Sequence, residues 1–210
     1  MQRLFILLYF YHMKHIVPAI FISLLFAACN NQPAAVIENT APKKDSVAVE
    51  KDFFPVPDYI GGQLKIIDSL KLPISKTVTI NGKDKLSQAT DQELRDIAQQ
   101  FREPNINDPS LKKHYTQTNI ADESVPSVTL MFATTDTTLV IQKMHVYIKP
   151  DPDKNDQVTG VYIEKQFNKN DTAFNQQLIW KTGKNVQITT EKKVKGKTLP
   201  VEQVKISWNY

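Results

Sequence analysis

The sequence predicts an α+β protein in which two or three N-terminal helices pack on a six-stranded, mainly antiparallel β-sheet. Two observations lead to this fold class. Before Pro126, apolar residues recur at helical spacing between capping and helix-breaking residues. After Pro126, apolar and polar residues alternate with a period of two, and turn signals separate the alternating runs. Consecutive strands joined by short turns form a meander, which we expect to lie flat under the helices or to curl into a half-barrel.

Three helices are expected in the N-terminal half. Asp58 can cap the first, whose apolar positions at helical spacing are Ile60, Leu64, Ile67 and Leu70. Thr90 and Glu93 have the spacing of a capping box and predict the start of the second, with a buried stripe of Leu94, Ile97 and Phe101. Asp108 followed by Pro109 predicts a short third helix, because proline is favoured at the first helical position.

Strands are expected on both sides of the second helix. Before it, Asn81-Gly82 suits a type I′ turn and predicts a short hairpin over residues 76–86. After it, six alternating runs predict the strands 127–135, 139–148, 157–167, 174–182, 185–194 and 201–209. One face should be covered by the helices, and the other is rich in Lys, Gln and Thr. The predicted core face consists of Val128, Leu130, Phe132, Val146, Ile148, Val161, Ile163, Leu178, Trp180, Val204, Ile206 and Trp208.

The charge balance excludes nucleic acid as an expected partner. The 210-residue chain has 26 basic and 22 acidic residues, a formal net charge of +4. Two of the basic residues, Arg3 and Lys14, precede Cys29, so beyond it 24 basic residues face 22 acidic ones, a net charge of +2. Such a balanced composition is not that of a nucleic acid-binding protein.

The segment that ends at Cys29 has the three parts of a secretory signal. Lys14 supplies the positive charge, Ile16 to Phe26 form the apolar core, and Ala27-Ala28 are the small residues at the cleavage site. Cys29 is the only cysteine of the chain and follows these small residues directly. We expect translation to begin at Met13. An uncleaved membrane helix and an ordinary secretory signal are the alternatives, but Ile16 to Ala28 is shorter than the about 20 residues of a spanning helix.

This segment resembles the lipobox of bacterial lipoproteins. The resemblance implies that the Cys29 thiol is acylated with diacylglycerol, that the peptide is cut before it, and that the new N-terminus is also acylated. The chain would then consist of a signal peptide (1–28), a lipidated cysteine with a flexible tether (29–52) and a single α+β domain (53–210). Its partner would be a membrane, bound through the acyl chains on Cys29, because several chains anchor a protein far more firmly than one.

We expect no cofactor, no metal site and no catalytic residue. Once Cys29 is lipidated, no thiol remains for a disulfide, a nucleophile or a metal ligand. Only His114 and His145 remain as histidines, and the sequence pairs neither with a partner for general acid–base catalysis. Residues 151–156, DPDKND, lack the Gly and Glu positions of a calcium loop and are typical of a solvated hairpin loop. Asp122-Glu123 is interpreted as solvated surface.

Two lysine-containing patterns have competing interpretations. Lys181-Thr182-Gly183 and Ser110 to Lys113 are similar to the Lys-Thr-Gly and Ser-x-x-Lys motifs of penicillin-binding enzymes. The Ser-x-Asn motif of those enzymes does not lie between them here, so a hairpin turn over Lys181 to Asn185 is the better interpretation. A set of lysines on the last hairpins could contact lipid headgroups or lipopolysaccharide phosphates. We favour the alternative interpretation, that these lysines protect exposed strand edges against aggregation. The set comprises Lys181, Lys184, Lys192, Lys193, Lys195 and Lys197.

The Cys-Asn-Asn start and the Lys/Asn/Thr-rich sheet resemble small uncharacterised lipoproteins of the Bacteroidota, a group that supplies no activity. The residues after Cys29, NNQPAAV, lack the acidic signal associated with surface export in that group, and Asn30 is not the Asp of inner-membrane retention. The expected location is therefore the outer membrane, facing the periplasm. The expected function is a non-enzymatic binding or envelope-assembly module with a possible protein or lipid partner. The alternatives are a carrier of lipid or another apolar ligand in a half-barrel cavity, and a hydrolase that uses a histidine.

Overall fold

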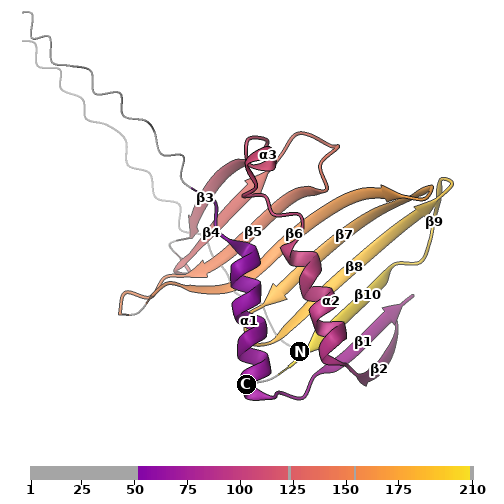
Figure 1. The fold of residues 1–210 in the computed structure, drawn as a ribbon, viewed down its shortest axis with the longest axis horizontal. Coiled ribbons are helices and arrows are strands. Elements are labelled where there is room, and N and C mark those ends of the chain that lie inside the picture. Colours follow the sequence, from indigo (N-terminus) through magenta and orange to yellow (C-terminus); the bar gives the residue numbers. More distant parts are fainter. Residues whose placement is uncertain (1–51, 123, 154, 209–210) are drawn as a thin grey trace, which may run out of the picture. The chain divides into compact units, whose positions relative to one another are not determined.

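The computed structural model describes residues 52–122, 124–153 and 155–208, which form an α+β fold with helices on one face of an antiparallel sheet (Figure 1). The sheet has ten strands, and the order along it is β2-β1-β10-β8-β7-β6-β5-β4-β3, with β9 paired to β8 beside this path. The predicted number of six strands is therefore wrong. The sheet is open, because β2 and β3 form its two edges.

Two long helices and one single turn make up the helical part. They are α1 (Val56–Leu70), α2 (Asp91–Arg102) and α3 (Pro109–Lys112). The capping box of Thr90 and Glu93 at the start of α2 is confirmed. The predicted cap of α1 is wrong: Pro55 occupies the N-cap position, and Asp58 lies in the first turn. Leu70 is 51% exposed instead of buried, because α1 ends there and Lys71 adopts a left-handed conformation.

The strands after Pro126 follow the predicted meander. From β4 to β9 each strand pairs antiparallel with the next, and β10 joins the meander by pairing with β8. They are β4 (Ser127–Ala133), β5 (Ile141–Lys149), β6 (Gln157–Lys169), β7 (Thr172–Lys181), β8 (Asn185–Val194), β9 (Lys197–Thr198) and β10 (Glu202–Ser207).

Three of the four additional strands precede Pro126, and the fourth is the two-residue β9. The predicted hairpin is confirmed as β1 (Ser75–Ile80) and β2 (Lys83–Gln88), with positive φ at both Asn81 and Gly82. It continues the main sheet, because β1 pairs with β10 over six residues. The other addition, β3 (Thr116–Asp122), pairs with β4 and lacks a periodic apolar signal, since all of its residues are exposed. The sheet is therefore extended at both ends, by long-range pairing at β1 and by a local hairpin at β3.

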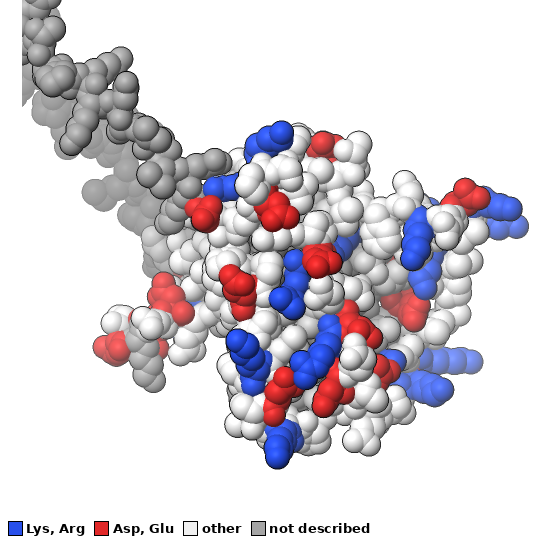
Figure 2. Space-filling view, viewed as in Figure 1, with Lys and Arg blue, Asp and Glu red and all other residues white. Residues whose placement is uncertain are grey.

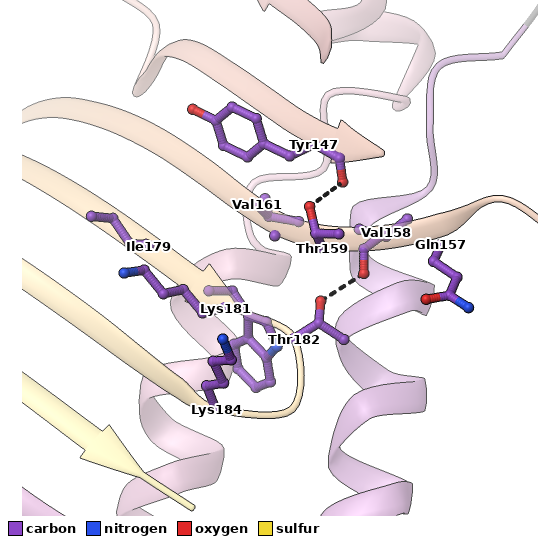
Figure 3. Close-up of a pocket in the computed structure, with 11 residues that line it drawn as sticks. Tyr147, Gln157, Val158, Thr159, Val161, Ile179, Lys181, Thr182 and Lys184 are labelled. Carbon is purple, nitrogen blue, oxygen red and sulfur yellow. Dashed lines mark hydrogen bonds between the residues drawn. The ribbon is translucent and has the colours of Figure 1, made fainter. Parts of the chain in front are cut away.

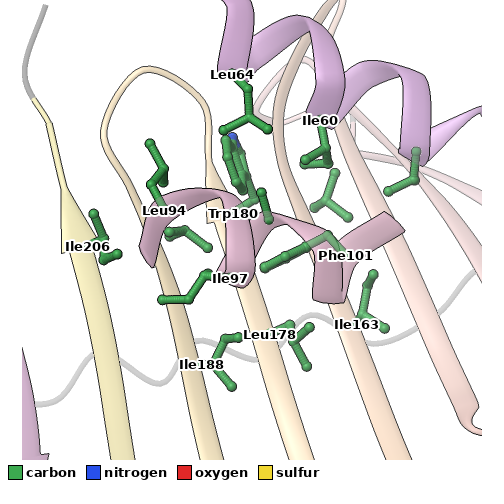
Figure 4. Close-up of a cluster of buried hydrophobic side chains, with 14 of the residues drawn as sticks. Ile60, Leu64, Leu94, Ile97, Phe101, Ile163, Leu178, Trp180, Ile188 and Ile206 are labelled. Carbon is green, nitrogen blue, oxygen red and sulfur yellow. The ribbon is translucent and has the colours of Figure 1, made fainter. Parts of the chain in front are cut away.

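The hydrophobic core lies between the sheet and the two long helices (Figure 4). Most of the predicted core-face residues are buried, and the strand register places them opposite one another, as with Ile163 and Leu178. Trp180 is fully buried and makes edge-to-face contact with Phe101 of α2, at 5.7 Å between ring centroids. Trp208 packs beside Trp180 with ring centroids 5.3 Å apart. The helix-covered face is thus filled by side chains at this point.

Several predictions concern residues that the structure does not describe. The signal peptide, Cys29 and the tether up to residue 51 lie outside the described residues. Within the described ranges, none of the helices combines the length and the apolar character that crossing a membrane requires.

Candidate functional site

Three aromatic side chains, those of His145, Tyr147 and Tyr162, lie together on the face of the sheet opposite the helices. The His145 ring lies 5.5 Å from the Tyr162 ring and 6.2 Å from the Tyr147 ring, measured between centroids. Tyr162 donates a 2.7 Å hydrogen bond to Glu164, which also forms an ion pair with Lys143. These side chains share one face because they occupy alternate positions on β5 and β6. His145 therefore lies on the polar face of the sheet, opposite the buried Met144 and Val146.

A bulge in the pairing of β5 with β6 creates a hollow beside this group. Tyr147 pairs with Gly160 and Ile148 with Val158, so Thr159 is the extra residue on β6. The Thr159 hydroxyl donates to the Tyr147 carbonyl at 3.2 Å and fixes the bulge. Bulges bend a strand locally and change the direction of neighbouring side chains. Here the bulge places the Tyr147 ring beside Gly160, which has no side chain.

Gly160 forms the floor of the hollow. A Cβ atom at this position would lie 2.8 Å from the Trp180 carbonyl oxygen and 3.7 Å from the Tyr147 ring. The approach to the Trp180 carbonyl favours glycine at this position, and the missing side chain leaves space on the sheet surface beside the Tyr147 ring. The resulting cavity of about 510 Å³, the bulge pocket, is lined by Tyr147, Gly160, Ile179, Lys181 and Lys184 together with their neighbours (Figure 3).

The bulge pocket combines apolar walls with a cationic rim. Tyr147 and Ile179 present apolar surface, whereas Lys181 and Lys184 are exposed at the turn between β7 and β8. No acidic side chain is among the described residues that line it. Burial raises the pKa of the Tyr147 hydroxyl, so this group stays protonated at neutral pH and can donate a hydrogen bond. The pocket therefore suits a ligand with an apolar part and an anionic group.

The pocket is held in place by the start of α1. The Tyr59 hydroxyl is hydrogen bonded to the Thr182 hydroxyl, and Thr182 donates to the Val158 carbonyl at 2.8 Å. The predicted hairpin turn over Lys181 to Asn185 is confirmed, and its Thr182 connects β7, β6 and α1. This arrangement fixes the two rim lysines relative to the pocket floor.

The two histidines lie in different parts of the fold. His114 is exposed in the segment between α3 and β3, whereas His145 is half-buried in the middle of β5. Burial lowers the pKa of His145, and the opposing charge of Glu164 is the smaller effect. Within the described ranges, the His145 imidazole makes ring contacts but no hydrogen bond. The ring is therefore placed as part of an aromatic surface.

The acidic sites of the sequence bind their own loops. Asp151 accepts a hydrogen bond from the Asp153 amide at 3.1 Å. Asp122 accepts from the Ser124 amide and hydroxyl, and these bonds lower its pKa. In the part of the chain that the structure describes, no three His, Cys, Asp or Glu side chains lie together as metal ligands would.

The lysines of the last hairpins form two groups instead of one. Lys181 and Lys184 lie at the start of β8, and Lys192, Lys193, Lys195 and Lys197 lie at or beyond its other end. Seven residues of β8, 185–191, separate the groups. The interpretation as edge protection is wrong for Lys181, Lys192 and Lys193, because β7 and β8 are interior strands, whereas Lys197 lies on β9, which pairs with β8 beside the main path. On the helix-covered face, Figure 2 shows acidic and basic side chains intermingled.

A buried lysine was missed in the sequence. Lys165 is 6% exposed on β6, and its ammonium group donates to the carbonyls of Gln100 and Glu103 at the end of α2. These carbonyls lack partners within the helix, and a cation is favoured at this end. Burial lowers the pKa of Lys165 to about 8, against the smaller opposing effect of Glu103. The sequence does contain a signal for this burial, because Lys165 has the period-two spacing of Ile163 and Phe167 and therefore lies on the same face of the strand.

The bulge pocket was also missed. Its one sequence signal is Gly160 in the interior of an otherwise alternating run, a position that often marks a bulge or a close backbone approach. Comparison of the chain with family models, curated proteins and solved structures found no match in any of the three.

Proposed function

We propose that this chain is a membrane-anchored periplasmic lipoprotein that acts as a non-enzymatic binding module, with the bulge pocket as its ligand site. The observation that carries the binding role is an apolar hollow of about 510 Å³ with two exposed lysines at its rim. Its volume falls within the range of small-molecule sites, which are apolar cavities with a few polar groups that orient the ligand.

The lining residues define the chemistry of the ligand. A planar or aliphatic group would pack on Tyr147 and Ile179, and a carboxylate, phosphate or sulfate would lie near Lys181 and Lys184. An anionic amphiphile of the cell envelope has both parts. The filled core under the helices supports a ligand held at the surface of the sheet over one enclosed between sheet and helices.

The anchor is proposed from Cys29 and the segment that precedes it. Acyl chains on Cys29 would hold the protein at the outer membrane. A tether of about 23 residues would give an average reach of roughly 25–30 Å, if it behaves as a flexible chain. The pocket would then operate close to the membrane surface, where anionic amphiphiles are concentrated.

The pocket can be tested with an aromatic sulfonate, 8-anilinonaphthalene-1-sulfonate, as the probe. We expect saturable binding to the full mature chain, measured by fluorescence titration. Lys181→Glu combined with Lys184→Glu should weaken it by about tenfold, because two favourable charges become repulsive. Tyr147→Ala should weaken it as well, because the apolar wall is lost.

Lys193→Glu combined with Lys195→Glu is the matched control, since it makes the same charge change at the other end of β8. It should leave the affinity unchanged. Equal loss in both double variants would show that the probe responds to net charge alone and would contradict a ligand site in the bulge pocket.

A further inference from the structure

The two edges of the sheet differ in their protection against pairing. The edge strand β2 carries Lys83, Asp84 and Lys85 among its six residues. The other edge, β3, has the sequence TQTNIAD and contains no Lys, Arg or Pro. Its seven residues are all exposed, and its register with β4 is continuous, without a bulge. Charged residues, prolines and bulges are the usual means by which proteins block an edge, and β3 lacks most of them.

We propose that β3 is a self-association edge that pairs antiparallel with β3 of a second copy of this chain, about a two-fold axis at Asn119. A two-fold interface must be self-complementary, because each residue meets its mate in the opposite order. This register uses all seven residues. It places Asn119 opposite Asn119, Thr118 opposite Ile120, Gln117 opposite Ala121 and Thr116 opposite Asp122.

The charges favour this antiparallel arrangement. The only charged residue of β3 is Asp122 at its end, and Lys113 precedes its start. Antiparallel pairing sets the Asp122 of each strand opposite the neutral Thr116 of the other, whereas parallel pairing would bring Asp122 beside Asp122. Like charges directly opposite each other destabilise a strand pair.

The apolar surface of the edge also fits a second copy. Ile120 is 52% exposed on β3 and would gain a neighbour across the new pair. One seven-residue strand pair buries less than the about 800 Å² per partner of a standard interface. The association should therefore be weak and depend on protein concentration.

Disulfide cross-linking tests the register. In a Cys29→Ser background, Asn119→Cys places two thiols opposite each other, within reach of a disulfide. Gln117→Cys is the matched control, because its two thiols would be offset by four residues, about 13 Å along the strands. Under mild oxidation we expect a covalent dimer with Asn119→Cys at least about fivefold more abundant than with Gln117→Cys. Equal yields, or no dimer with Asn119→Cys, would overturn the register.

Sedimentation of the full mature chain without lipid tests the edge itself. Wild type should show a monomer–dimer equilibrium. Asn119→Lys should weaken it by about tenfold, since it sets two lysines face to face. Gln88→Lys makes a similar change on β2 and should have no effect. A wild-type chain that stays monomeric up to millimolar concentration, or an Asn119→Lys variant that dimerises like wild type, refutes the proposal. The bulge pocket and its probe binding do not depend on this result.

Discussion

Gly160 is the residue on which the bulge pocket depends most directly. We expect Gly160→Ala to destabilise the protein by about 1–3 kcal/mol, because the added Cβ would lie 2.8 Å from the Trp180 carbonyl oxygen and the strands would have to separate. The measurement is the free energy of unfolding from urea denaturation. The variant should also lose affinity for the sulfonate probe, because the new methyl group occupies the pocket floor.

Gly61→Ala is the matched control for this substitution. Gly61 lies inside α1, and an added Cβ meets no atom within 4 Å. It should stabilise the protein by about 0.5–1 kcal/mol, the difference in helix propensity between the two residues. If Gly160→Ala were as stable as Gly61→Ala, the close approach of β6 and β7 at this position would be incorrect.

Lys165 gives the protein a specific dependence on pH. Its pKa is about 8 in the folded state, below the ordinary value of 10.5, so the unfolded chain holds the proton up to a higher pH. Between these two values the unfolded state binds more protons, and the free energy of unfolding should rise with pH. The rise amounts to about 3 kcal/mol at most. Urea denaturation at pH 7, 8, 9 and 10 would measure it.

Lys165→Met should remove this rise and also destabilise the protein at pH 7 by about 1–3 kcal/mol, because two carbonyls of α2 lose their donor. Lys169→Met changes an exposed lysine of the same strand and should behave as wild type. The role assigned to Lys165 would be untenable if both variants kept the same pH dependence.

At the scale of the element, α2 is defined at both ends by polar contacts. Thr90 and Glu93 form the capping box at its start, and Glu93 also pairs with Lys76 of β1 at 2.7 Å. Lys165 of β6 binds the carbonyls at its end. The helix is therefore attached to two distant strands of the sheet, which keeps its apolar stripe over the core.

Glu93 makes the attachment of α2 sensitive to acid. Hydrogen bonds from Lys76 and from the Thr90 amide lower its pKa from 4.5 to about 2. Its stabilising contribution is complete above the ordinary pKa and is lost as pH falls toward 2. Glu93→Gln should therefore flatten the decrease in unfolding free energy between pH 5 and pH 2. Asp91→Asn, in the same turn, is the control, and an identical flattening there would argue against the assignment.

Some of these elements could be predicted from local sequence signals alone, and others could not. The capping box and the Asn81-Gly82 turn were predicted because a few adjacent residues define each of them. The strand β3 was not predicted, because an exposed strand carries no apolar alternation and is defined only by its pairing with β4. For the same reason, no local pattern indicated that β1 pairs with β10, more than 100 residues away.

At the scale of the whole molecule, the central proposal is attachment through Cys29. Cys29→Ala should move the protein from the membrane to the soluble envelope fraction, because a thiol is required for diacylglycerol attachment. Fractionation of cells followed by immunoblotting would measure this. Retention of the Cys29→Ala protein in the membrane fraction would contradict a lipid anchor. As a control, the Cys29→Ala protein should bind the sulfonate probe in its bulge pocket with the same affinity as wild type.

The sequence by itself determined the fold class, the helices, the meander and most of the core face. These follow from short-range periodicity, in which each side chain is assigned to a face by its neighbours three or four residues away in a helix and two in a strand. Trp180, Leu178 and Ile163 could therefore be assigned to the core before their partners were known.

The tertiary structure alone decided the extent of the sheet and the location of the site. The pairing of β1 with β10 joins residues more than 100 positions apart, the edge strand β3 is defined by its pairing with β4, and the two lysine groups are separated by the extended strand β8. The bulge pocket arises where Gly160 meets the Trp180 carbonyl across two strands. Such contacts follow from which strands lie side by side, a property of the folded chain that no single segment contains.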